Sequence, residues 1–149
     1  MSLTDLLKEG RLRRHRTSDE EIKALLGIAE RSIADASVQA VSADARFAMA
    51  YNAILQLATI PLCCHGYRAR GEGRHFTTYQ TLTDTMGPDQ SDRVAYFDDC
   101  RKKRNIAEYD RAGEVSQQEV EELLAEAKAF MGEVKQWLWD KYPNLMAGE

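Results

Sequence analysis

The segment from about Ser42 to Cys64 is apolar around most of a helical circumference. Its large apolar side chains are Phe47, Met49, Tyr51, Ile54, Leu55, Leu57, Ile60 and Leu62. A helix that is apolar on all sides must be covered by other elements on several of them. A chain of 149 residues is long enough to bury one core built around such a helix.

The remaining pattern is also helical. Ser18 to Glu21 and Ser116 to Glu119 read as capping boxes, each followed by apolar residues at helical spacing. Gly87-Pro88 is a strong turn, and no alternating strand candidate exceeds a few residues. Helices are expected at 18–36, 42–64, 75–85 and 91–110, with a last one from 116 that ends before Pro143. The sequence therefore predicts an all-α fold, an antiparallel bundle of four to five helices.

We expect residues 1–149 to form a single domain, with residues 1–17 as a flexible amino-terminal arm that includes His15. No apolar run approaches the length that a membrane span needs, and the charged amino terminus does not resemble an export signal. Cys63, Cys64 and Cys100 are odd in number, and two are adjacent, which favours reduced thiols. A cytoplasmic protein that contacts no membrane is predicted.

The net charge of −4 hides a separation of charge along the chain. Acidic residues gather in 114–149, and basic residues form three clusters, at Arg11–Arg16, at Arg68, Arg70 and Arg74, and at Arg101–Arg104. If the three clusters converge in space, they make an anion site on an otherwise acidic protein.

We predict neither a metal site nor a cofactor. His65 follows Cys63 and Cys64, but three neighbouring residues at a helix end cannot all face one ion, and the ligand spacing of zinc sites is absent. The loop at 66–74 carries three Gly and three Arg, but it lacks the strand that precedes a dinucleotide-binding loop.

Residues 98–110 combine polar groups that suit phosphate. At 100° per residue, Arg104 falls about 40° from Cys100, within the apolar arc of the helix. Arg101, Asn105 and Tyr109 follow one another at four-residue intervals and form a polar stripe beside it. A guanidinium, an amide and a phenol on one helix could grip phosphate or orient a ribose. The alternative is that Arg104 extends along the bundle and pairs with Glu108.

The run Arg104-Asn105-Ile106-Ala107-Glu108-Tyr109 resembles the signature of HEPN domains, helical bundles in which an Arg, often followed by Asn, precedes a His four to six residues later. The resemblance implies a two-fold homodimer whose motif helices face one another across a cleft. Many members are metal-independent ribonucleases of toxin–antitoxin or defence systems. Here Tyr109 stands near the place of the His, and a phenol with a pKa of about 10 is poorly matched to proton transfer at neutral pH.

On this resemblance, Arg104 and Tyr109 are the expected catalytic residues, and Arg101, Asn105, Arg74 and His75 are expected to bind substrate. His75 could reach the same cleft from the basic loop. The expected ligand is RNA or a nucleotide. The resemblance further implies a minimal nucleotidyltransferase as partner, for which Tyr109 is the candidate acceptor.

Two other functions remain open. One is a non-catalytic helical interaction module that dimerises through the apolar segment 42–64. The other is a small-ligand pocket inside the bundle, gated by the loop from Gly66 to Gly73.

Overall fold

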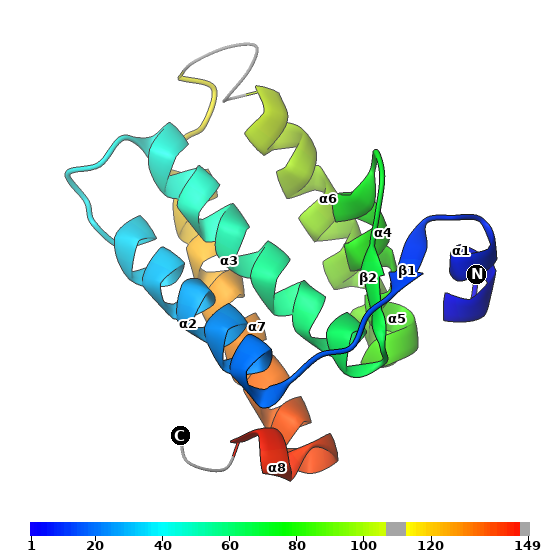
Figure 1. Cartoon of the computed structure of the whole chain (residues 1–149). Coiled ribbons are helices and arrows are strands. Elements are labelled where there is room, and N and C mark those ends of the chain that lie inside the picture. Colours follow the sequence, from blue (N-terminus) through cyan, green and yellow to red (C-terminus); the bar gives the residue numbers. More distant parts are fainter. Residues whose placement is uncertain (107–112, 147–149) are drawn as a thin grey trace.

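The computed structural model of the chain describes residues 1–106 and 113–146. Its four long helices are α2 (Asp19–Ala36), α3 (Ala43–Cys64), α6 (Ser91–Asn105) and α7 (Gln117–Lys141). Successive long helices run in opposite directions along the length of the molecule (Figure 1). The predicted all-α, antiparallel bundle of four to five helices is confirmed.

Helix α3 is the centre of the bundle. It packs against α2 and α7 on one side and against α4, α5 and α6 on the other, so most of its residues are buried. Within the described part of the chain, α3 is the one helix long and apolar enough to cross a membrane, although 61% of the stretch concerned is buried. Our expectation that no run approaches this length was therefore wrong, and the covering helices account for its apolar character.

The two expected capping boxes differ in outcome. At the start of α7, the Ser116 hydroxyl accepts from the Glu119 amide, and the Glu119 carboxylate accepts from the Ser116 amide. At the start of α2, Ser18 accepts from the amide of Glu21. The carboxylate of Glu21 does not return to Ser18 but turns to side chains of other segments.

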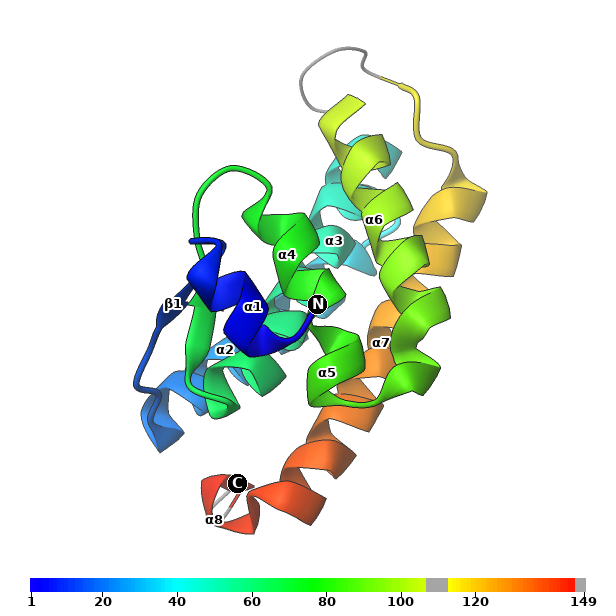
Figure 2. The same cartoon turned by 90° about the vertical axis from the view of Figure 1, so that its right-hand side faces the viewer.

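The helix expected at 75–85 is divided in two. Helix α4 (Arg74–Gln80) and helix α5 (Leu82–Thr85) meet at Thr81, and a 3-10 turn, η1 (Pro88–Gln90), leads directly into α6. Gly87 before this turn has a φ of +122°, and a Cβ there would lie 2.9 Å from Asp89 Oδ1. The short helices thus place the start of α4 beside the end of α6 (Figure 2).

Residues 1–17 pack on the bundle instead of forming a flexible arm. Helix α1 (Leu3–Lys8) leads into strand β1 (Leu12–Arg14), which pairs antiparallel with β2 (Tyr67–Ala69). Leu6 and Leu12 are buried against Leu62 of α3 in a small second core. The loop expected at 66–74 therefore contains a strand, because its partner strand supplies hydrogen bonds and an apolar contact from a distant part of the sequence.

At the other end of the molecule, α8 (Pro143–Met146) folds back after α7 and contacts α2. Met146 is buried in the main core. This contact closes the end of the bundle opposite the end of α6 and the start of α7 (Figure 1).

Candidate functional site

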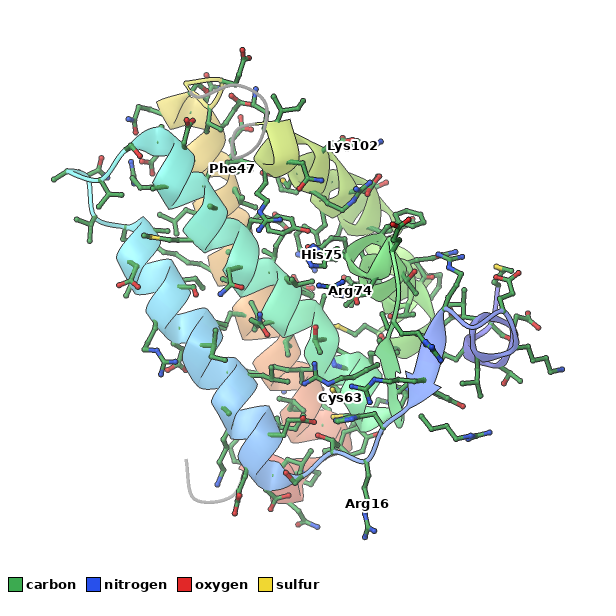
Figure 3. All side chains as sticks on the ribbon, turned by 45° about the horizontal axis from the view of Figure 1, so that its top comes forward. Arg16, Phe47, Cys63, Arg74, His75 and Lys102 are labelled. Atoms are coloured by element: carbon green, nitrogen blue, oxygen red, sulfur yellow. The ribbon has the colours of Figure 1, made fainter. Side chains whose placement is uncertain are left out.

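A basic pocket lies between the start of α4 and the last turns of α6. It has a volume of about 260 Å³ and is lined by Gly73, Arg74, His75, Arg101, Arg104 and Asn105. Figure 3 shows Arg74 and His75 on α4, in the space between α3 and α6. Five of the six expected site residues meet here, and Tyr109 lies outside the described residues.

Arg104 forms the inner wall of the pocket. Its guanidinium carbon lies 5.4 Å from the ring centroid of Tyr51 on α3, a distance that suits a cation–π contact. One terminal nitrogen, Nη1, donates to Asn105 Oδ1 at 3.4 Å. These contacts hold the cation against the apolar body of the bundle, half-buried, where its charge is screened less than on an open surface.

The other two arginines differ in how much charge they leave available. Arg101 is half-buried, and its Nε donates to Asp98 Oδ1 at 2.8 Å, while Lys102 pairs with the same carboxylate at 3.4 Å. Arg74 is exposed at the pocket mouth, and among the described residues no acid pairs with it. The pocket therefore keeps a positive balance despite Asp98.

His75 is held by a hydrogen bond of 3.0 Å between its Nδ1 and the hydroxyl of Tyr51. Burial lowers the pKa of His75 below its ordinary value of 6.5, and the charges of Arg104, Arg74 and Arg101 lower it further. The imidazole is therefore neutral at neutral pH. Since an imidazole nitrogen and a phenol can each donate or accept, the tautomer of His75 follows from the direction of this bond.

Tyr51 is the site residue that sequence reasoning missed. Burial raises its pKa to about 12, against the opposing effect of Arg104, so the phenol stays protonated and can either donate to His75 or accept from it. Behind it, the ring of Tyr79 packs edge-on at 6.2 Å, and among the described residues the buried Tyr79 hydroxyl has no hydrogen-bond partner. The only sign of this role in the sequence is a phenol hydroxyl within a largely apolar helix, and the helical pattern assigns Tyr51 to the core.

A second pocket adjoins the first. It has a volume of about 130 Å³, and it shares Arg74 and His75 with the first pocket. The other lining residues are Leu55, Gln56, Thr59, Arg68, Ala69 and Thr78. The two pockets therefore adjoin at Arg74 and His75, and together we call them the groove, which extends from α6, past the start of α4, to strand β2.

A cluster near the carboxyl end of α3 brings together three potential metal ligands. Among the described residues, potential ligand atoms of His15, Glu21 and Cys63 lie within 4.8 Å of one another, whereas His65 instead contacts the carbonyl of Pro61. The Glu21 oxygens already contact His15 at 2.7 Å and Arg68 at 3.2 Å. Burial raises the pKa of the Cys63 thiol to about 11. A cation entering here would face the guanidinium of Arg68, so the cluster functions better as an ion-pair network than as a metal centre.

Fold and pocket define a small all-α bundle with a cationic groove beside its penultimate long helix. A family model described as SAV_6107-like HEPN matches residues 36–135, more than half of the chain. The protein belongs to the HEPN family, and the resemblance inferred from its sequence is confirmed. No curated protein and no solved structure matches the chain.

Proposed function

We propose that this HEPN protein binds the phosphate of RNA or of a nucleotide in the pocket of Arg104, as one component of a toxin–antitoxin or defence pair. The observation that carries the proposal is the gathering of Arg74, Arg101 and Arg104 with His75 and Asn105 around one cavity. Guanidinium groups bind phosphate oxygens through short, charge-assisted hydrogen bonds, which are about twice as strong as neutral ones.

His75 adds a proton-transfer group to this set. Its pKa is lowered by burial and by the three arginines, and a bound phosphate would offset those positive charges and raise it again. Phosphate binding and protonation of His75 are thus expected to favour each other.

We further propose metal-independent cleavage of RNA, with His75 in the role of the missing motif His. In the tautomer whose Nδ1–H donates to the Tyr51 hydroxyl, His75 would accept the proton of the ribose 2′-hydroxyl at Nε2 as the 2′-oxygen attacks phosphorus. The bond to the 5′-oxygen then breaks, and the 5′-oxygen takes a proton from water, which leaves a 2′,3′-cyclic phosphate and a 5′-hydroxyl. Arg104 would stabilise the charge that develops on the phosphate oxygens, and Tyr51 would position the imidazole.

Homodimerisation, a minimal nucleotidyltransferase partner and modification of Tyr109 are also proposals that rest on the family. A cytoplasmic location is a further proposal, which the reduced thiols expected from the cysteine count support. Helix α3 is covered by helices of its own chain and needs no second copy to bury it. The same finding weakens the alternative of an interaction module that associates through α3.

The test is binding and cleavage of labelled single-stranded RNA in metal-free buffer by wild type, Arg104→Ala, His75→Gln and Arg31→Ala. Arg31 is an exposed arginine of α2 away from the groove, so its variant controls for loss of one charge. Fluorescence anisotropy reports binding, and gel electrophoresis reports cleavage.

Arg104→Ala is expected to weaken binding at least tenfold, equivalent to about 1.4 kcal/mol, while Arg31→Ala binds as the wild type does. His75→Gln should abolish cleavage and leave most of the binding. Equal binding by Arg104→Ala and Arg31→Ala would refute the phosphate site. Binding without cleavage by the wild type would refute only the ribonuclease step.

A further inference from the structure

The β1–β2 ribbon presents a face of arginines. The ladder pairs Arg13 with Arg68, and the amide of Arg70 donates to the carbonyl of Arg11. Directly opposed residues, and residues two apart on one strand, project from the same face of an antiparallel pair. Arg13 and Arg68 therefore share one face of the ribbon, and Arg11 and Arg70, each one residue beyond its strand, continue that face. Leu12 on the other face is buried.

This face continues the groove of the candidate site. Arg68 lines the second pocket together with Arg74 and His75, which also line the pocket of Arg104. Arg13 lies directly across the ladder from Arg68. The path from Arg104 to Arg13 thus passes through residues that line the same pocket and then across one pair of the strand ladder.

The charges along this path are not equally available. Arg68 pairs with Glu21 at 3.2 Å, and Arg11 donates to Thr77 and Gln80 of α4. By contrast, Arg13 and Arg70 are exposed, and neither forms an ion pair among the described residues. Arg68 and Arg11 thus fix the ribbon to the bundle, and Arg13 and Arg70 remain for a ligand.

We infer that the ligand of this protein is a single-stranded RNA of several nucleotides whose backbone runs from the Arg104 pocket along the groove onto the β1–β2 ribbon. The inference rests on the proposed function and deepens it, because a mononucleotide would have no use for the ribbon. The ribbon's first strand lies outside the residues that the family model matches, 36–135, so it is a feature of this chain beyond the matched core.

The shape of the groove favours a single strand. The two pockets, of about 260 and 130 Å³, are small hollows that suit a phosphate or part of a nucleoside rather than the side of a duplex. Between the cations, the second pocket offers the apolar side chain of Leu55 and the amide of Gln56. A positively charged groove that follows the backbone is typical of sites for single strands.

The experiment compares a labelled dinucleotide with a labelled single-stranded RNA of about 12 nucleotides, the length range that such grooves cover. Uncleavable 2′-O-methyl forms of both are used, and anisotropy is measured over a range of salt concentrations. The variants are Arg104→Ala, the ribbon double variant Arg13→Ser/Arg70→Ser, and the control Arg31→Ser/Lys128→Ser. The control removes the same charge from exposed positions of α2 and α7, and circular dichroism checks that each variant is folded.

The wild type should bind the longer RNA more tightly than the dinucleotide. The ribbon variant should lose about tenfold in affinity for the longer RNA and reduce the slope of log affinity against log salt by about 1 to 2. It should bind the dinucleotide unchanged, whereas Arg104→Ala should weaken both ligands.

If the dinucleotide binds in an Arg104-dependent way but the ribbon variant matches its charge control on the longer RNA, the inference is wrong and the proposed function stands. If the wild type binds neither RNA, both fail. Loss of binding to phosphatidylserine vesicles in the ribbon variant, with RNA affinity unchanged, would assign the ribbon to a membrane surface and overturn the inference.

Discussion

Replacement of Glu21 by Gln is expected to loosen the β1–β2 ribbon from the bundle. Glu21 lies in the first turn of α2, and its two carboxylate oxygens contact His15 at 2.7 Å and Arg68 at 3.2 Å, while Thr17 donates to it at 2.7 Å. Since His15 follows β1 and Arg68 belongs to β2, one carboxylate ties both strands to α2.

The magnitude follows from the pKa of Glu21. Burial alone would raise this pKa, but hydrogen bonds from Thr17 and His15 and the charge of Arg68 lower it from 4.5 to about 2. That difference corresponds to about 3 kcal/mol in favour of the ionised, folded state. Because the side chain is 26% exposed, solvent screening reduces the expected contribution to about 2 kcal/mol.

The direction of the pKa shift of Glu21 determines the pH range over which the carboxylate stabilises the fold. A carboxyl group whose folded pKa lies below its unfolded pKa stabilises the fold fully above the unfolded value, and the contribution is lost as pH falls through the folded value. The free energy of unfolding of Glu21→Gln should therefore be about 2 kcal/mol lower than that of the wild type at pH 7, and this deficit should shrink to less than half at about pH 3.

Urea denaturation at pH 7, 5, 4 and 3 measures this deficit. Glu20→Gln is the matched control, because Glu20 is exposed one residue earlier in the same turn and no described side chain contacts it. The reasoning would be refuted if the two variants were equally stable at pH 7, or if the deficit of Glu21→Gln were the same at pH 3 as at pH 7.

Three further predictions concern other parts of the fold. Arg46→Ala should lower the free energy of unfolding by about 3 kcal/mol, because Arg46 is fully buried and its Nε donates to the Ala36 carbonyl at 2.8 Å. A loss under 1 kcal/mol, measured by urea denaturation, would contradict this prediction. The pKa of His75 is lower in the folded state, so the unfolded chain takes up the proton first and the wild type loses stability as the pH falls below 6.5. His75→Gln should remove this contribution and flatten the pH dependence of the free energy of unfolding. If the free energy of unfolding changed with pH equally in both proteins between pH 6.5 and 5, the imidazole would not be buried and neutral. Gly87→Ala should destabilise by about 2 kcal/mol, because φ is +122° and the new Cβ would lie 2.9 Å from a carboxylate oxygen. The same change at Gly132, where nothing lies within 4 Å, should be neutral or stabilising by up to about 1 kcal/mol, and thermal melts of the two variants would show the contrast.

Local patterns in the sequence were sufficient for the bundle. The apolar circumference of 42–64 required cover on several sides, and the structure provides it with α2, α7, α4 and α6. The capping box at Ser116 was read correctly because every atom in it comes from four consecutive residues. Helical periodicity and caps are short-range properties, so one sequence contains the whole signal.

The site was predicted in part for the same reason. The angular position of Arg104 on its helix placed it towards the core, and it lies against Tyr51. The proximity of Arg104 to Arg74 and His75 was inferred only from the basic loop that precedes His75, because helical periodicity does not show how α4 lies relative to α6. The hydrogen bond between Tyr51 and His75 was missed, since a tyrosine in an apolar helix gives no sign of which way its hydroxyl points.

The ribbon and the buried ion pairs were decided by tertiary structure alone. Residues 1–17 read as an arm because a strand of three residues has no pattern until its partner is known. Arg46 lies in an apolar helix, yet it is fully buried and joins the end of α2 to the start of α7. The sequence by itself determined which residues form helices and which faces must be covered. Only the fold decided which charges meet, because electrostatic contacts join residues that are distant in sequence, and nothing in either segment alone records its partner.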